Sequence, residues 1–300
     1  MDEFLQQLSN GLAVGGIYAL IALGYTMVYG VLKLINFAHG DLFTLGAYLG
    51  FSLLVSTGLS GHLPIILAII VVTVLVMGLV GTVGVLLERT AYRPLRHSDR
   101  LSAVVSALGA SIFFQNAIML AYDARSEVYP ILDTSEVFNL TGGGAHLGRG
   151  LMFLTSLALM LILYWFINRT RLGAAIRATA IDRDAARLMG IDVNRIISTV
   201  FFIGPALGGA AGVMVGLYYT QIDYTMSWVY GLKAFTAAIL GGIGNIPGAM
   251  LGGLLLGVIE SLGSAYISFA WRDAIAFLVL ICILIFRPTG LLGEKTADKI

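Results

Sequence analysis

The sequence predicts an all-α fold, a polytopic transmembrane helix bundle of eight or nine spans that includes short or broken helices. Three observations predict this fold class: an apolar composition, a series of apolar segments near membrane-span length, and glycines repeated at four-residue spacing. Of the 300 residues, 58% are hydrophobic and only 12% are charged, whereas soluble domains average about 25% charged residues. A water-soluble fold of this size cannot hide so much apolar surface.

The charge and the cysteine content further limit the possible classes of protein. A formal net charge of +1 excludes a broad basic surface, so no nucleic acid is expected as a partner. The single cysteine, Cys282, cannot form an intrachain disulfide. Asp2 and Glu3 stand where a cleavable signal carries basic residues, so we expect the first apolar run to remain as the first span.

The apolar segments follow one another along the whole chain. A bilayer core needs about 20 apolar residues per helix. The segments that begin at Leu42 and Leu232 are shorter and are flanked by Gly, Asn, His or Pro, so we expect short, tilted or broken helices that line a cavity. The candidate spans are Leu12–Val31, Leu42–Val55, Leu63–Leu87, Leu101–Tyr122, Leu151–Ile167, Ile196–Tyr219, Leu232–Ile243, Ala249–Ala265 and Ala274–Phe286.

Basic residues gather on one predicted side of these spans. They concentrate in Glu88–Arg100, in Asn168–Arg195 and in the tail, which holds Arg287, Lys295 and Lys299. The positive-inside rule places these segments and the C-terminus in the cytoplasm. Nine crossings then put the N-terminus in the periplasm, with Asp123–Arg149 as the main external loop.

Glycines recur every fourth residue and therefore lie on one face of a helix, where backbones can approach closely. Two interpretations are open: plain helix packing, and helices that shift against each other. A second run, Gly241–Gly248, is predicted to break or sharply turn the chain. The repeated positions are Gly204, Gly208, Gly212 and Gly216, then Gly244, Gly248 and Gly252, with single steps at Gly11–Gly15 and Gly46–Gly50.

Polar residues inside apolar segments are costly to bury and are therefore functional candidates. For the stretch from Asn36 to Asp41 two interpretations are open, helix capping at a membrane interface and a gate. Lys233 and Glu260 either pair or snorkel separately toward the outer surface, and we expect snorkelling. The candidate residues of a translocation path or gate are Tyr18, Tyr25, Asn36, His39 and Asp41.

The motifs of soluble enzymes are missing from the sequence. No G-x-x-x-x-G-K-[ST] phosphate loop exists, because no lysine follows a glycine. No H-E-x-x-H, C-x-x-C or G-x-S-x-G pattern occurs, and His39 has no second ligand at metal-binding spacing. The sequence therefore predicts a conduit without catalytic, cofactor-binding or metal-binding residues.

One cytoplasmic segment predicts a short protruding helix. Asp182 is suited to cap its start, and Gly190 is suited to the left-handed position just past its end. Asp184 and Arg187 are spaced as an ion pair at i, i+3. A helix of about two turns is marginal alone, so we expect the bundle behind it and a partner groove in front to hold it. Its apolar face is formed by Ala185, Leu188 and Met189.

The same segment resembles a known motif. Asp184-Ala185-Ala186-x-x-x-Gly190 is similar to the E-A-A-x-x-x-G core of ABC importer permeases, in which the loop docks into a cleft of the ATPase subunit. Asp184 replaces the usual Glu and keeps its charge, whereas Pro205 lies later than the proline of the pattern. The resemblance implies that the coupling residues are Asp182, Asp184, Ala185, Ala186, Leu188, Met189 and Gly190.

Longer stretches resemble the LivH-type permease family of high-affinity branched-chain amino acid ABC transporters. They lie in the expected order over nearly the whole chain: Tyr18–Gly30, Ile35–Asp41, Glu88–Arg96, Gly231–Ala249 and Arg287–Gly293. The resemblance implies one transmembrane permease domain over residues 1–300 with a cytoplasmic coupling helix, in a bacterial inner membrane, that imports Leu, Ile and Val. The region least similar to the family is the 123–149 loop.

The resemblance also implies partners. They are a second related permease subunit of the LivM type that completes a heterodimer, two cytoplasmic ABC ATPase subunits that bind ATP and Mg, and a periplasmic amino-acid-binding protein. Alternatives are a related permease for urea, short amides or other amino acids, a stand-alone secondary transporter, and a structural scaffold. No series of acidic residues for ion coupling lies within the spans, and a scaffold leaves the protruding helix unexplained.

Overall fold

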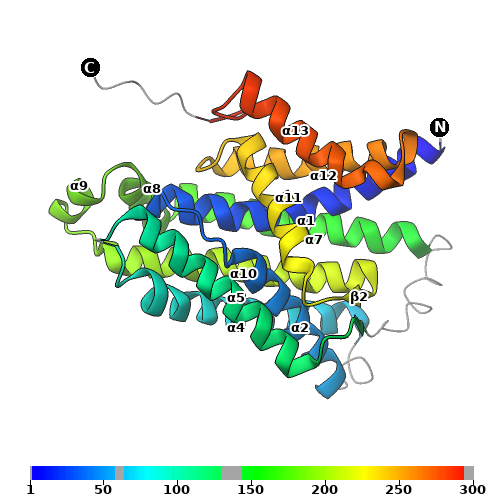
Figure 1. Ribbon diagram of the computed structural model, residues 1–300, viewed down its shortest axis with the longest axis horizontal. Helices are drawn as coiled ribbons and strands as arrows, with labels where there is room; N and C mark the ends of the chain where they lie inside the picture. The colour runs from blue at the N-terminus through cyan, green and yellow to red at the C-terminus, as the bar shows by residue number, and fades with distance from the viewer. Residues whose placement is uncertain (1, 58–63, 97, 130–143, 294–300) are drawn as a thin grey trace.

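The computed structural model describes residues 2–57, 64–96, 98–129 and 144–293, which form a bundle of α-helices (Figure 1). The predicted fold class, a polytopic helical bundle, is confirmed. The α-helices are α1 (Asp2–Leu32), α2 (His39–Thr57), α4 (Ile65–Leu87), α5 (Arg100–Tyr122), α7 (Gly144–Arg169), α8 (Arg171–Ile181), α9 (Arg183–Leu188), α10 (Val193–Tyr219), α11 (Met226–Gly241), α12 (Ile246–Tyr266) and α13 (Arg272–Phe286). Shorter elements are the π-helix η1 (Glu88–Tyr92), the 3-10 helix η2 (Phe269–Trp271) and the antiparallel strands β1 (Glu127–Val128) and β2 (Gln221–Ile222).

Each predicted apolar segment corresponds to one of these helices. Within the described ranges, seven helices are long and apolar enough to cross a membrane. Helices α2 and α11 are not among them, with 19 and 16 residues. They are the two segments that the sequence predicts to be short, and Figure 1 shows α11 running steeply across the direction of α1 and α12. The count of eight or nine crossings depends on these two helices and stays a prediction.

Helices α1 and α10 form the centre of the bundle. Within an apolar stretch of 18 residues in each helix, about 94% of the residues are buried in α1 and 83% in α10, against 17% in α5 and 6% in α13. The outer helices expose large apolar side chains, among them Ile112, Leu120 and Phe286. Hydrocarbon is the environment in which such a surface carries no cost. The burial pattern therefore distinguishes a packed centre from a lipid-facing shell.

Small residues bring the central helices into close contact. A Cβ atom on Gly257 of α12 would collide with the backbone of Gly15 on α1. A Cβ atom on Gly212 of α10 would collide with the carbonyl oxygen of Phe43 and lie 2.7 Å from the amide nitrogen of Ala47, both on α2. Close backbone approach explains the four-residue glycine spacing as packing, whereas movement of the helices stays a prediction.

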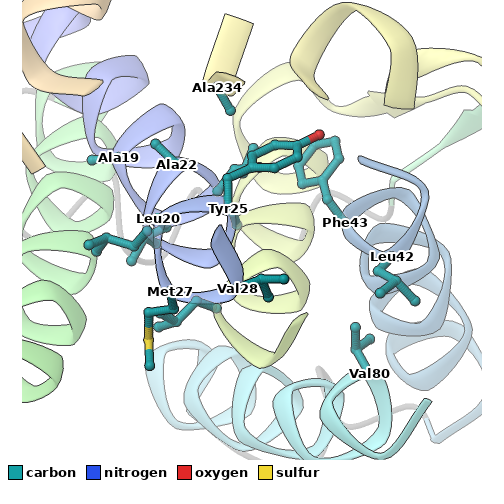
Figure 2. Packing of buried hydrophobic residues seen from close by; sticks show 14 of the residues in the cluster. Ala19, Leu20, Ala22, Tyr25, Met27, Val28, Leu42, Phe43, Val80 and Ala234 are labelled. Carbon is teal, nitrogen blue, oxygen red and sulfur yellow. The ribbon is translucent and has the colours of Figure 1, made fainter. Parts of the chain in front are cut away.

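Side chains fill the space beside these contacts. Figure 2 shows Tyr25 of α1, Phe43 of α2, Val80 of α4 and Ala234 of α11 within one cluster of buried apolar side chains. All four are buried, with at most 6% exposure. Helices α2 and α11 are therefore part of the packed interior although they are not among the seven candidate spans.

The glycine-rich stretch forms a sharp turn, as the sequence predicts. Helix α11 ends at Gly241 and α12 begins at Ile246. Gly242 and Gly244 between them have φ values of +106° and +98°, a region that residues with a Cβ atom rarely occupy. The side chain of Asn245 then caps α12 by accepting a hydrogen bond from Gly248 N at 2.9 Å.

The arginine-rich segments meet at one end of the bundle. Arg96 donates to Asn194 across 2.6 Å and so joins two of them, and Figure 1 shows α8 and α9 at this end. The N-terminus and the β1–β2 pair lie at the opposite end (Figure 1). Residues 130–143 of the predicted external loop, and the predicted cytoplasmic residues Lys295 and Lys299, lie outside the described residues. Which end faces the cytoplasm stays a prediction.

Candidate functional site

The start of α9 is fixed by the side chain of Asp182. This residue has extended backbone angles, φ −151° and ψ 116°, and separates α8 from α9. Its Oδ1 atom accepts hydrogen bonds from the amides of Asp184 and Ala185 at 2.9 and 3.0 Å. These amides would otherwise lack partners in the first turn of the helix. The predicted N-cap is confirmed.

The end of α9 is closed by Gly190. Its φ value is +82°, its amide donates to Arg187 O at 3.0 Å, and the amide of Ile191 donates to Ala186 O at 3.1 Å. This pair of bonds is a Schellman motif, which satisfies the last carbonyls of a helix. Because both ends are satisfied internally, six residues form a defined helix, Arg183–Leu188.

The apolar face of α9 points away from the protein. Leu188 is 89% exposed and Met189 is 83% exposed, and Ala185 beside them is also exposed. Ile181, just before the cap, is 88% exposed and enlarges this surface. Sequence reasoning missed Ile181 because it lies outside the capped helix; an apolar residue directly before an N-cap is the signal that could have identified it.

Contacts with other helices hold α9 in place. Ala186 is buried at the base of the helix, and the guanidinium of Arg183 donates to Val31 O at the end of α1 across 3.0 Å. Burial, and then the charge of nearby Arg187, lowers the pKa of Arg183. Asp184 and Arg187 form the predicted i, i+3 ion pair at 3.4 Å.

Behind α9 lies a buried ion pair that sequence reasoning did not single out. Glu88 is fully buried, and its carboxylate pairs with Arg96. The same carboxylate accepts a hydrogen bond from Ser198 Oγ of α10 at 2.8 Å, and Arg96 also reaches Asn194 at the start of α10. Glu88 therefore links η1 to α10, the helix that follows α9. A glutamate at the end of an otherwise apolar span is the available signal.

Three of the candidate gate residues lie around the junction between α1 and α2. Asn36 Oδ1 accepts a hydrogen bond from the Tyr92 hydroxyl at 2.7 Å. His39 Nε2 lies 3.1 Å from Ile21 O, and its ring meets the ring of Tyr25 edge-on at 4.7 Å between centroids. All three candidates, Asn36, His39 and Tyr25, are buried. The junction is thus held by contacts to α1 and to η1.

The other two candidates have partners outside this junction. Asp41 accepts a hydrogen bond from Ser111 of α5 at 2.5 Å. The Tyr18 hydroxyl, near the middle of α1, donates to Glu260 of α12 at 3.2 Å. The five candidates therefore do not converge on one point, although each lies on α1, on α2 or in the connection between them.

The expectation that Lys233 and Glu260 snorkel separately is wrong. Lys233 Nζ lies 2.8 Å from Glu260 Oε1, and the two side chains are 4% and 1% exposed. Lys233 also pairs with Asp273 at 2.6 Å, and Arg272 pairs with Glu260. The steep course of α11 points the lysine toward α12 and α13, and opposite charges nearby compensate its burial.

Within the described ranges, no group of three His, Cys, Asp or Glu side chains is placed to hold a metal ion. What the structure does hold is a bundle with an apolar outer surface, charged groups in its interior and a short helix that exposes an apolar face at the arginine-rich end. These features define the class of protein: a polytopic membrane protein whose protruding helix is accessible to another protein.

Comparison with known sequences identifies the family. Residues 7–284 match the family described as "Branched-chain amino acid transport system / permease component", and the chain belongs to this family. The chain is 45% identical to the high-affinity branched-chain amino acid transport system permease protein BraD of Pseudomonas aeruginosa, with 99% of this chain and 98% of the relative covered. It is 42% identical to LivH of Escherichia coli K12, also over 99% and 98% of the two chains. No solved structure matches the chain.

Proposed function

We propose that this chain is a membrane-spanning subunit of a bacterial inner-membrane ABC importer that translocates Leu, Ile and Val. A periplasmic binding protein delivers the amino acids, a second related permease completes a heterodimer, and two separate cytoplasmic ATPase subunits bind ATP and Mg. The observation that carries the proposal is the exposed apolar face of α9 at the arginine-rich end of the bundle. Similarity to high-affinity branched-chain amino acid permeases over the full chain supports the substrate class.

Helix α9 has the features of a surface that docks into a partner. Exposed leucine and methionine side chains outside the lipid-facing spans are costly in water and favour burial against another protein. The flanking charges of Asp184 and Arg187 supply a polar rim. We assign the contact with an ATPase subunit to Asp182, Asp184, Ala185, Ala186, Leu188, Met189 and Gly190.

Movement of α9 has a direct route into the bundle. Arg183 holds the end of α1, and the chain passes from Gly190 into α10 with only Ile191 and Asp192 between them. The Glu88–Arg96 pair connects the start of α10 to η1. A displacement imposed by the ATPase pair therefore acts first on α1, α10 and η1, which include the two most buried spans.

The gate assignment follows from this route. Asn36, His39 and Asp41 lie in or beside the connection between α1 and α2, and Tyr25 packs on His39. We place a gate at these residues and a point of the path at Tyr18. In the proposed cycle, ATP binding closes the ATPase pair and turns the bundle outward, and hydrolysis reverses this. The N-terminus is then periplasmic and the C-terminus cytoplasmic.

The coupling assignment is tested with Gly190→Val. A β-branched side chain at φ +82° costs about 1–2 kcal/mol, and it distorts the end of α9 without a collision, because no atom of the described residues lies within 4 Å of the new Cβ. Leucine uptake into proteoliposomes and binding-protein-stimulated ATP hydrolysis, measured on the reconstituted complex, are expected to fall roughly fivefold or more.

The matched control is Gly109→Val on α5, another glycine with open space around it but no positive φ. Normal uptake by an assembled Gly190→Val complex would contradict the coupling assignment. Uptake of leucine by this chain alone, without nucleotide, would contradict the importer proposal as a whole.

A further inference from the structure

A cluster of charged side chains lies between α11, α12 and α13, in the half of the bundle away from α9. Glu260 is its centre: the Oε1 atom accepts from Tyr18 Oη at 3.2 Å and lies 2.8 Å from Lys233 Nζ, and Arg272 pairs with the same oxygen. Asp273 completes the cluster at 2.6 Å from Lys233. Two cations and two anions give it no net charge.

The second carboxylate oxygen of Glu260 has no partner among the described residues. Its Oε2 atom is buried and makes no hydrogen bond to them, while three donors meet at Oε1. Glu260 is 1% exposed, so water does not reach this side chain freely. An ionised carboxylate oxygen without a partner is costly in the interior. It is an unused acceptor for a positively charged donor.

Aromatic rings form an apolar wall next to these charges. The rings of Tyr18 and Tyr230 have centroids 6.3 Å apart, and those of Tyr219 and Tyr230 are 6.1 Å apart. Arg272 donates to the Tyr219 hydroxyl at 3.0 Å, which ties the wall to the cluster. Paired opposite charges beside a hydrocarbon-like surface are complementary to a small zwitterion with an aliphatic side chain.

The exposure of the charged side chains in this cluster decreases from the surface inward. The side chain of Asp273 is 59% exposed and that of Arg272 is 23% exposed, whereas Lys233 and Glu260 are closed off at 4% and 1%. A solute that arrives at the end of the bundle away from α9 therefore meets Asp273 and Arg272 first. Separation of α13 from α11 and α12 would open the inner pair.

We propose that Glu260, Lys233 and Arg272 form a transient binding site for the charged head of the transported amino acid. Glu260 receives the ammonium group, and Lys233 and Arg272 receive the carboxylate. The inference rests on the proposed function and assigns its path residues. The solute and the cluster each carry no net charge. Ion pairs within the cluster can therefore be replaced by ion pairs to the solute without leaving an uncompensated charge in the interior. A solute with one charge would leave such an excess.

The test uses the complete complex in proteoliposomes, with labelled leucine delivered by the binding protein. In Glu260→Gln the ammonium loses its charged acceptor, so leucine uptake per ATP hydrolysed is expected to fall ~10-fold or more. Binding-protein-stimulated ATP hydrolysis is expected to stay within about twofold, because the variant leaves α9 untouched. The matched control is Glu3→Gln, the same change at an exposed carboxylate. Unchanged uptake per ATP in Glu260→Gln overturns the inference.

A second variant separates transport from assembly. Lys233→Met/Glu260→Met replaces one buried pair by apolar side chains, a change that folds commonly tolerate. We expect the complex to assemble and to hydrolyse ATP with little uptake. Wild-type uptake by this variant, or failure of both variants to assemble, would assign the charges to structure alone. Absence of uptake by the wild-type complex would instead refute the proposed function.

Discussion

At the scale of single residues, Glu88 links the protruding end of the protein to its interior. Its side chain is fully buried and is shared between Arg96 of the arginine-rich segment and Ser198 of α10. The charge of Glu88 therefore compensates the burial of Arg96, whose side chain is 10% exposed. Removing either partner leaves the other charge uncompensated in a place that water hardly reaches.

We expect Glu88→Gln to destabilise the complex by about 3 kcal/mol, because it leaves the Arg96 guanidinium buried without its counter-charge. Thermal unfolding of the purified complex measures the effect. Ser198→Ala, which removes only one hydrogen-bond donor to the same carboxylate, is the matched control and should cost about 1 kcal/mol. The double variant Glu88→Gln/Arg96→Met should recover part of the loss; equal losses in the single and double variants would show that an uncompensated Arg96 charge is not the cause.

At this scale the sequence predicts a side-chain contact correctly only where the two bonded residues are close along the chain. Asp182 and Gly190 were identified correctly because their bonds reach residues two to five positions away. The Lys233–Glu260 pair spans 27 positions and two helices. Whether such residues pair or snorkel depends on the direction in which α11 crosses the bundle, and that direction is set by packing between distant segments.

At the scale of elements, the contact between α2 and α10 depends on the absence of a side chain. Gly212 of α10 lies against the backbone of Phe43 and Ala47 of α2. Within a membrane the hydrophobic effect does not hold helices together, so close van der Waals packing of this kind stabilises their association instead. The contact also sets the position of α2, which carries His39 and Asp41 at its start.

We expect Gly212→Ala to destabilise the protein by about 1–3 kcal/mol, because the added methyl group forces α2 away from α10. The readout is the thermal unfolding of the complex in detergent. Gly78→Ala on α4 is the matched control, since no atom of the described residues lies within 4 Å of a Cβ there, and the change should be neutral or slightly stabilising. A larger loss in the control than at Gly212 would contradict this account of the packing.

The helices themselves could be predicted from the sequence, because apolar run length and turn-forming residues are local properties. Of the two segments predicted to be short, α11 has 16 residues, whereas α2 extends to 19 residues. The five gate candidates are polar residues within apolar runs. The structure gives three of them contacts to α5, η1 and α12, while His39 and Tyr25 contact each other. Polarity marks a residue as costly to bury but does not identify its partner.

At the scale of the whole molecule, the structure separates an end that carries α8 and α9 from an end that carries β1 and β2 (Figure 1). The positive-inside rule assigns the first end to the cytoplasm. The burial pattern, with α1 and α10 central, agrees with a bundle that lies in lipid.

This orientation can be tested by labelling with a membrane-impermeant maleimide in a Cys282→Ser background, since Cys282 is the only cysteine. We expect Leu188→Cys to react only after the membrane is broken, and Ala124→Cys to react in intact spheroplasts. Both positions are exposed and lie at opposite ends of the bundle. The reverse pattern would place α9 outside the cell and remove its access to a cytoplasmic ATPase.

Helix α10 extends without interruption between the two ends. It begins at Val193, shortly after Gly190 has closed α9, and it ends at Tyr219. The next residue is Thr220, whose carbonyl accepts a hydrogen bond from the amide of Tyr129 at 2.9 Å. Twenty-seven residues of helix span about 40 Å. A shift of this helix along its own axis at one end of the bundle would act on the strand pair at the other end, with Pro205 inside the helix as the place where it can bend.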